Sequence, residues 1–263
     1  MSDESEDPEE KEEKEEKEEL VADAEEFKAF LKPSPNFDER NPDVHLRYVV
    51  LHYTGMPTRD VALQRLCNPK SKVSAHYLID DEGRLFKLVE EDKRAWHAGK
   101  GFWRGATDIN SASIGIELVN PGHAYGYTKF PKAQTNFLKD LLKEVMKRNR
   151  LNPATALLAH ADIAPDRKED PGELFPWEDF AKEGFGLWPS VERKDYEPIQ
   201  DFEEQKLLRT IGYDCPDNGV YDPPTRAALL AFQRRYDPAN ITGTPERETI
   251  ARMRALVRAI AKT

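Results

Sequence analysis

Residues 48–52 read Tyr48-Val49-Val50-Leu51-His52, a short apolar run that ends in a histidine. An unbroken apolar run of this length is typical of a strand that is buried on both faces of a sheet. Similar runs predict further strands at residues 76–80, 84–88, 113–118 and 157–159. The first two of these are separated by a turn that contains a glycine, so we expect them to form a hairpin.

A long amphipathic helix is predicted to begin at Pro131, with Phe137, Leu141 and Val145 along one stripe. Strands and helices therefore alternate over about 150 residues, which is an ordinary length for one domain. We predict an α/β domain in which helices flank a mixed central sheet.

The chain changes character after Trp188, where charged sequence with prolines begins. We interpret residues 31–188 as the α/β domain and residues 189–200 as a linker. Beyond the linker, three helical patterns separated by turns with glycine predict a small three-helix domain at residues 201–263. Its helices are expected at residues 202–211, 224–236 and 246–260.

The formal charge of −10 is concentrated at the N-terminus. Residues 1–19 hold 12 acidic residues and three lysines, so the remainder of the chain is almost neutral. Such a segment buries too little apolar surface to fold alone, and residues 1–30 are predicted to be an acidic tail that is disordered or helical. The spacing of Phe27 and Leu31 predicts that a helix emerges over residues 21–31.

This charge distribution excludes several classes of protein. A nearly neutral body lacks the clustered basic surface that nucleic acids require, so no nucleic-acid partner is expected. No run approaches the roughly 18 apolar residues of a membrane span, and acidic residues occupy the place of a secretory signal's basic start. We therefore expect no membrane span and a cytoplasmic location, the alternative being the periplasm or export by a non-standard route. Cys67 and Cys215 are expected to be free thiols in apolar surroundings.

Two histidines are predicted to close strands, where a rigid frame holds side chains next to loops. His52 follows the first strand, His160 follows the strand at 157–159, and a loop with two prolines then leads to Asp170. Two imidazoles and one carboxylate would form an open zinc site with a fourth position left for water. By spacing alone, core or turn histidines are the favoured interpretation. Asp162 is a rival ligand, although a role in the turn is favoured for it.

Five stretches with characteristic sequences follow one another along residues 47–177. They are Val50-Leu51-His52-Tyr53-Thr54, Val73-Ser74-Ala75-His76-Tyr77-Leu78-Ile79, Ala95-Trp96-His97-Ala98-Gly99, Ser113-Ile114-Gly115-Ile116-Glu117-Leu118 and His160-Ala161-Asp162-Ile163-Ala164-Pro165-Asp166-Arg167-Lys168-Glu169-Asp170-Pro171-Gly172. In this order they resemble the zinc-dependent N-acetylmuramoyl-L-alanine amidases of the AmpD/AmiD type, in the amidase type 2 superfamily. That superfamily also contains phage amidases and peptidoglycan recognition proteins.

The resemblance implies a hydrolase that cleaves the amide bond between N-acetylmuramic acid and L-alanine in peptidoglycan or muropeptides. It implies one zinc ion per chain, held by His52, His160 and Asp170. It further implies that Glu117 is the catalytic carboxylate and that Lys168 stabilises the oxyanion. Residues expected to contact substrate are His76, Trp96 and His97, whereas His45 and His123 are interpreted as surface residues.

The C-terminal segment resembles a peptidoglycan-binding domain, although Asp222 stands where many members have glycine. A purely structural helical cap is the alternative for this segment. For the whole chain, the alternative to an amidase is a recognition protein that binds muropeptides without cleaving them, and a zinc peptidase is a third interpretation. The presence of all three metal ligands and of Glu117 favours the enzyme.

Overall fold

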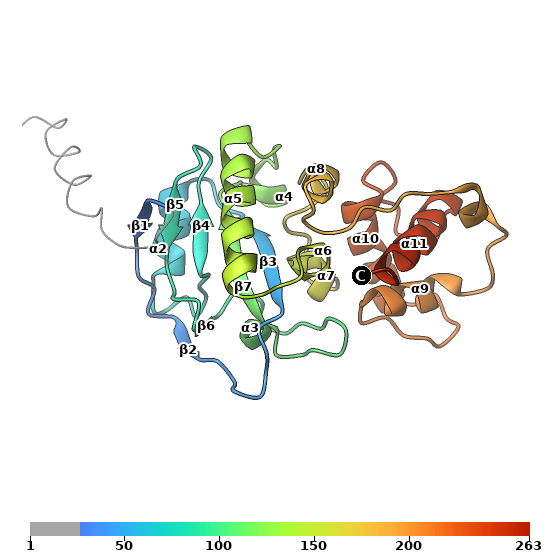
Figure 1. Cartoon of the computed structure of the whole chain (residues 1–263), viewed down its shortest axis with the longest axis horizontal. Helices are drawn as coiled ribbons and strands as arrows, with labels where there is room; N and C mark the ends of the chain where they lie inside the picture. The colour runs from blue at the N-terminus through green and yellow to red at the C-terminus, as the bar shows by residue number, and fades with distance from the viewer. Residues whose placement is uncertain (1–26) are drawn as a thin grey trace, which may run out of the picture.

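The computed structural model describes residues 27–263, in which an α/β domain lies beside a helical C-terminal module (residues 201–263; Figure 1). A six-stranded sheet with the order β1-β5-β4-β7-β3-β8 forms the centre of the domain. Its strands are β1 (Ala29–Leu31), β3 (Tyr48–Tyr53), β4 (Tyr77–Ile79), β5 (Leu85–Lys87), β7 (Ser113–Leu118) and β8 (Leu157–Ala159). Only the β4–β5 pair is antiparallel, so this sheet is mixed, as predicted.

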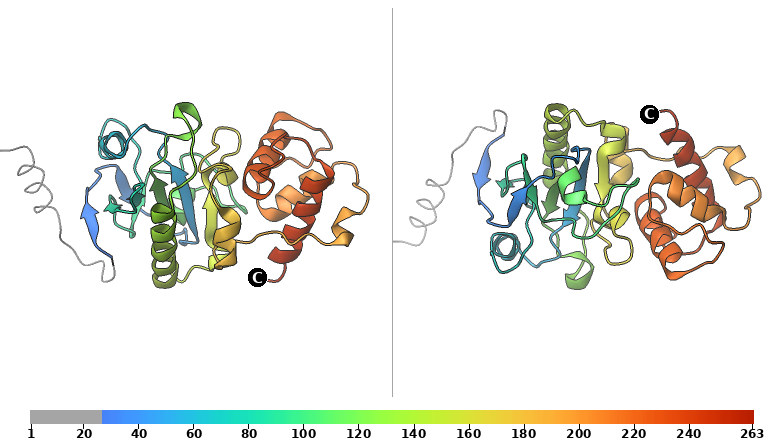
Figure 2. Two further views of the ribbon diagram at one scale, coloured as in Figure 1. Left: turned by 90° about the horizontal axis from the view of Figure 1, so that it is seen from above. Right: turned by 90° about the horizontal axis from the view of Figure 1, so that it is seen from below.

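Helices cover both faces of the sheet. The long helix α5 (Lys132–Arg148) lies on one face and α2 (Arg59–Leu66) lies on the other (Figure 2). Short helices fill the connections: α3 (Ile109–Ala112), α4 (Gly122–Tyr125), α6 (Pro153–Ala156), α7 (His160–Ile163) and α8 (Trp177–Lys182). A separate antiparallel pair, β2 (Phe37–Glu39) with β6 (Lys93–Ala95), borders the sheet.

The strands predicted from apolar runs are confirmed at β3, β4, β5, β7 and β8. Strands β3 and β7 are buried along almost their whole length, and Val49, Val50 and Leu51 of β3 are completely inaccessible to solvent. Covering on both faces explains why these strands are continuous apolar runs instead of alternating ones. The hairpin between β4 and β5 is also present, with Gly83 in the left-handed region at φ +83°.

The prediction of a helix over residues 21–31 is wrong at its C-terminal end. Residues 29–31 instead form β1, which pairs in parallel with β5 in the register Ala29↔Leu85. The helical spacing was a local signal, and the free edge of β5 provides backbone hydrogen bonds that a short isolated helix lacks. Residues 21–26 lie outside the described residues.

Helix α2 was not predicted, because its apolar stripe is narrow. Within it only Ala62 and Leu66 are buried. The available signal was the cap, where the Thr58 side chain accepts a hydrogen bond from the Val61 amide at 3.3 Å.

The C-terminal module contains the three expected helices, α9 (Glu203–Ile211), α10 (Pro223–Tyr236) and α11 (Arg247–Ile260). It shares one continuous core with the α/β domain. The ring of Trp103 meets the ring of Tyr213 edge to face at 5.0 Å between centroids, and Trp188 packs against Tyr236 at 6.0 Å. The module is therefore docked on the domain (Figure 1).

The segment at residues 189–200 contains a 3₁₀ helix, η1 (Arg193–Tyr196), that packs against α11. Asp195 of η1 forms an ion pair with Arg258 of α11. Cys67 and Cys215 are free thiols. Within residues 27–263, none of the helices is both long and apolar enough to cross a membrane.

Candidate active site

Three parallel strands bring the predicted site residues to one edge of the sheet. In the ladder of β3 and β7, His52 is the register partner of Glu117. On the other side of β3, Leu51 pairs with Ala159, so His160 follows directly at the end of β8. Carboxyl ends of parallel strands meet at the same edge, and this edge forms the floor of a cavity of about 870 Å³.

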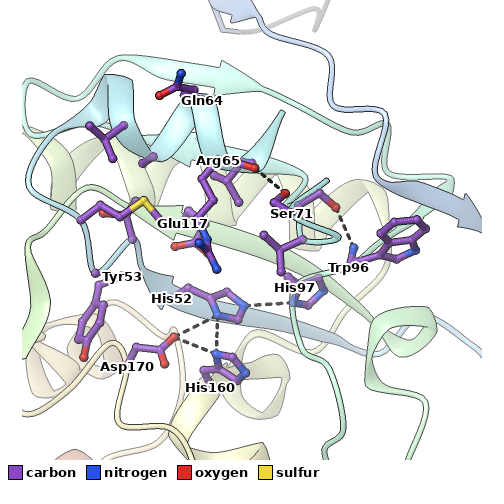
Figure 3. A pocket seen from close by; sticks show the side chains of 18 of the residues that line it. His52, Tyr53, Gln64, Arg65, Ser71, Trp96, His97, Glu117, His160 and Asp170 are labelled. Carbon is purple, nitrogen blue, oxygen red and sulfur yellow. Dashed lines mark hydrogen bonds and ion pairs between the residues drawn. The ribbon is translucent and has the colours of Figure 1, made fainter. Parts of the chain in front are cut away.

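His52, His160 and Asp170 converge on one point of this floor (Figure 3). The two Nδ1 atoms lie 2.9 Å apart, and Oδ2 of Asp170 lies 3.1 Å from Nδ1 of His52 and 3.0 Å from Nδ1 of His160. All three residues are buried. Two imidazole nitrogens and one carboxylate oxygen at such mutual distances are a suitable donor set for a divalent metal ion.

The second ring nitrogen of each histidine is held by another group. Nε2 of His160 donates to the carbonyl of Ala98 at 3.1 Å, and Nε2 of His52 lies 3.0 Å from Nδ1 of His97. His97 in turn contacts the Ser113 hydroxyl at 3.3 Å. The Ala98 carbonyl can only accept, so Nε2 of His160 carries the proton. The Ser113 hydroxyl donates to the Ile109 carbonyl and therefore accepts from Nε2 of His97, which leaves Nδ1 of His97 to accept from Nε2 of His52. In the neutral form of each ring Nδ1 is then free to bind a metal, which is the usual arrangement for metal-binding histidines.

A glycine makes room for this chain of imidazoles. A Cβ atom on Gly115 of β7 would lie 2.3 Å from Cγ of His97, closer than real contacts allow. The glycine in the stretch Ser113-Ile114-Gly115-Ile116-Glu117 is therefore required so that the His97 ring can cross the strand.

The protonation states also suit a metal. Burial and the neighbouring His160 lower the pKa of His52 to about 4, so its imidazole is neutral near pH 7. Burial alone would raise the pKa of Asp170, but the two histidines outweigh it and hold that pKa well below its usual range. A neutral His52 imidazole beside an ionised Asp170 carboxylate is a combination that coordinates a metal.

Glu117 has the properties of an acid–base group. Its Oε2 is shielded from solvent and has no hydrogen-bond partner within residues 27–263. Burial and the negative charge of Asp170 raise the pKa of Glu117 well above its usual value, whereas the positive charge of Lys168 lowers it. Lys168 itself lines the same cavity. The carboxylate and the cation thus lie beside the cluster of His52, His160 and Asp170.

The remaining predicted residues divide into two groups. Trp96 and His97 line the cavity. His76 is not among the residues that line it, and its contact with substrate stays a prediction. Its ring is completely buried, where Nδ1 accepts from the Gly115 amide at 2.9 Å and Nε2 contacts the Lys93 carbonyl at 3.1 Å. With both nitrogens engaged, His76 supports the sheet under the site.

Asp162 is not a ligand of this cluster. Its carboxylate accepts hydrogen bonds from the Ala159 amide at 2.8 Å and from the Tyr213 hydroxyl at 2.7 Å. The interpretation of Asp162 as a turn residue is therefore the better one.

His123 was interpreted as a surface residue, and the structure corrects this. It is half-buried beside the site, where Nδ1 lies 3.0 Å from the hydroxyl of Tyr53 and Nε2 lies 3.2 Å from the Glu173 carboxylate. Its ring stacks on Tyr127 at 4.2 Å. The topology of the sheet could have indicated this position, because His123 follows β7 at the same sheet edge as the cluster of His52, His160 and Asp170. His45 is exposed, as expected.

Comparisons with known proteins agree with this geometry. The sequence model of the N-acetylmuramoyl-L-alanine amidase family matches residues 41–173, and that of a peptidoglycan binding domain matches residues 203–253. The chain is 36% identical over 233 residues to the N-acetylmuramoyl-L-alanine amidase AmiD of Escherichia coli, a match that spans 81% of this chain and 82% of that protein. It is 33% identical over 162 residues to the 1,6-anhydro-N-acetylmuramyl-L-alanine amidase AmpD of Haemophilus influenzae, spanning 55% of this chain and 86% of that protein.

Solved structures give the same picture. A complex of E. coli AmiD with the substrate anhydro-N-acetylmuramic acid-L-Ala-D-gamma-Glu-L-Lys superposes with a TM-score of 0.73 at 31% identity, covering 93% of this chain and 99% of that chain. The structure of AmpDh3 from Pseudomonas aeruginosa superposes with a TM-score of 0.74 at 28% identity, covering 92% and 99%. Both matches extend across the α/β domain and the C-terminal module.

Proposed function

The chain belongs to the N-acetylmuramoyl-L-alanine amidase family, and we propose that it is a zinc-dependent member that acts through the cluster at the end of β3 and β8. Its reaction is hydrolysis of the amide bond between the lactyl group of N-acetylmuramic acid and the L-alanine of the stem peptide. The observation that carries the zinc proposal is the convergence of His52, His160 and Asp170 beside Glu117 in one cavity.

The donor set fits zinc. Nδ1 of His52, Nδ1 of His160 and Oδ2 of Asp170 would hold the ion, because two proton-free nitrogens 2.9 Å apart repel each other unless a cation lies between them. A zinc ion held there would supply Lewis acidity and would lower the pKa of a water molecule towards about 7. The ring of His97 and the carbonyl of Ala98 keep the two ligand imidazoles in the required orientation.

Glu117 is proposed to move the proton. Its raised pKa and unpartnered Oε2 suit a carboxylate that accepts a proton from water as the water attacks the lactyl carbonyl carbon. The same carboxyl would then return that proton to the departing L-alanine nitrogen. One group thus serves as base and then as acid, and the cycle leaves Glu117 as it began.

Lys168 is proposed to stabilise the negative charge that develops on the carbonyl oxygen. Lys168 lines the cavity wall, and a cation held against the protein is more effective in this role than one in bulk water. Lys168 is close enough to influence the pKa of both Glu117 and His52, and this proximity supports the proposed role of its charge.

Trp96 and His97 are proposed to contact the substrate. Both lie on the wall of the cavity, and the amphipathic indole of Trp96 suits the apolar face of a sugar ring. The cavity is open to solvent and large enough for a glycopeptide fragment. Because AmiD was solved with an anhydro-muramyl tripeptide, we propose muropeptides of cell-wall recycling as the substrates of this chain.

The C-terminal module is proposed to bind peptidoglycan, on the strength of the family match over residues 203–253. Intact wall polymer is then a second candidate substrate. Cell fractionation, together with rates on purified anhydro-muropeptides and on whole sacculi, would distinguish recycling from remodelling and would identify the compartment.

The decisive experiment measures release of stem peptide from an anhydro-muramyl tripeptide. Removal of metal with a chelator should abolish release, and added zinc should restore it. Glu117→Gln should retain bound zinc and reduce turnover by about 100- to 10,000-fold, the range expected for a general acid–base group. Glu178→Gln, a change to an exposed glutamate on α8, is the matched control and should leave turnover unchanged.

Turnover that is indifferent to chelation and to zinc would contradict the metal proposal. Tight binding of the tripeptide with no release by the zinc-loaded wild type would instead favour the recognition protein.

A further inference from the structure

The C-terminal module contacts the α/β domain at β8 and α7, the two elements that flank the junction at His160. Arg235 of α10 is 4% exposed, and its guanidinium carbon lies 4.2 Å from the centroid of the Trp177 ring. Its Nη2 donates to the carbonyl of Leu157 in β8 at 3.0 Å, and its Nη1 forms an ion pair with Asp162. One arginine of the module thus contacts the strand that leads to His160.

Asp162 belongs to α7, whose first residue is His160. The Asp162 carboxylate is completely buried, and both of its oxygens have partners. Oδ2 accepts from the Ala159 amide at the start of α7 and pairs with Arg235, while Oδ1 accepts from the Tyr213 hydroxyl at 2.7 Å. The turn that presents His160 is therefore tied to two residues of the C-terminal module.

A second contact involves the loop that runs from the end of α7 to Asp170. Nη2 of Arg234 lies 3.2 Å from Oε2 of Glu169, the residue before Asp170. This pair is partly exposed, so by itself it contributes little. It nevertheless shows that α10 touches the chain next to two of the three proposed metal ligands.

We propose that Arg235 is a positioning residue of the active site: through its buried pair with Asp162, the C-terminal module holds α7 and thereby the Nδ1 atom of His160 in place for the metal. The inference rests on the proposed metal function of His160. It gives the module a task in the active site that is separate from binding to the wall. A buried guanidinium and carboxylate are costly to dehydrate, and breaking the pair would leave an uncompensated charge beside α7.

The test compares Arg235→Met with a matched control in the full-length chain. The control is Arg258→Met, which removes an ion pair to the buried Asp195. The other contacts of Arg258 are with Glu192 and Ser190 and not with α7. The zinc dissociation constant is measured by competition with a chromophoric chelator, and the visible spectrum of the cobalt-substituted protein reports the ligand geometry. Circular dichroism confirms that each variant is folded at the temperature used.

Arg235→Met should weaken zinc binding by about 10- to 100-fold, the range for residues that orient metal ligands, and should alter the cobalt spectrum. Arg258→Met should lower thermal stability without either change. Arg235→Lys should restore zinc affinity in part, because an ammonium can pair with Asp162 but cannot also reach the Leu157 carbonyl in the same planar geometry.

A wild-type zinc dissociation constant and cobalt spectrum in folded Arg235→Met would overturn the proposal and leave Arg235 with a purely structural role. Should Arg235→Met not fold, Tyr213→Phe removes one hydroxyl from Asp162. Weaker zinc binding in that variant supports the proposal, and unchanged binding with an unchanged cobalt spectrum overturns it. Failure of the wild type itself to bind zinc would contradict the proposed function and not this inference.

Discussion

At the scale of single residues, the site depends on how neighbouring charges set the acidity of Glu117. Burial and Asp170 favour the protonated form, and Lys168 opposes them. A general base must be deprotonated before the reaction, so the acidic limb of the pH profile reports the pKa of this carboxyl. Lys168 therefore has two proposed effects, one on the oxyanion and one on the pH at which Glu117 becomes active.

Replacement of Lys168 separates these effects. In Lys168→Met the cation that lowers the pKa of Glu117 is gone, so this pKa rises and the acidic limb of kcat/KM should move to higher pH. We also expect kcat at the optimum to fall by about 100-fold or more, as for loss of one oxyanion-stabilising group. Lys168→Arg keeps the charge and should keep the position of the limb. An unmoved limb in Lys168→Met would show that its charge does not act on Glu117.

At the scale of elements, β7 carries both Glu117, the proposed catalytic carboxyl, and the space for the His97 ring. Glu117 projects at one end of the strand, and two residues earlier Gly115 lies under the His97 ring. His97 contacts His52, a proposed metal ligand, so the absence of a side chain on β7 affects a histidine on β3. The sequence of β7 is thereby coupled to the orientation of His52.

Gly115→Ala is expected to push the His97 ring away from His52. Zinc affinity should fall by about 10- to 100-fold, since His97 orients a ligand, and the free energy of unfolding should fall by about 1–3 kcal/mol, as for overpacking in a core. The measurements are zinc competition and urea denaturation. In a His97→Ala background the same change should cost much less, because the clash is gone. Equal losses in both backgrounds would mean that the ring is not the obstacle.

At the scale of the whole molecule, the two parts of the chain share a core and a buried ion pair. Trp103 and Trp177 of the α/β domain are almost completely buried, and both face residues of the C-terminal module. The match to AmpD covers 86% of that protein but only 55% of this chain. In this chain the α/β domain has an apolar surface that the module covers.

A chain that ends at Pro189 is therefore expected to be less stable than the full-length protein. It exposes two tryptophans and leaves the buried Asp162 without Arg235. The midpoint of thermal unfolding should fall by at least about 5 °C, equivalent to roughly 2 kcal/mol for a domain of this size. Val220→Ser, at an exposed position of the module, should leave the midpoint unchanged in the full-length chain. A truncated chain that unfolds at the full-length midpoint would contradict the shared core.

Local sequence patterns were sufficient to predict the buried strands and the histidines of the candidate site. The buried strands were readable because a strand covered on both faces is apolar throughout, and β7 and β8 begin and end at the predicted residues. His52 and His160 were identified because they close such strands within recognisable motifs, and the structure brings them together with Asp170. Their roles, and those of Glu117 and Lys168, remain predictions.

Contacts between distant residues decided the rest. Residues 29–31 form β1 in place of the predicted helix because they pair with the edge of β5. The Gly115 amide donates a hydrogen bond to His76, and this contact holds the His76 ring inside the sheet and not on the cavity wall. His123 becomes a neighbour of the site only because β3 and β7 end at the same edge. Asp162 was a rival ligand in the sequence and is a partner of Arg235, 73 positions away, in the structure. Such pairings leave no local pattern, because the free energy of a buried polar group depends on the partner that the whole fold supplies.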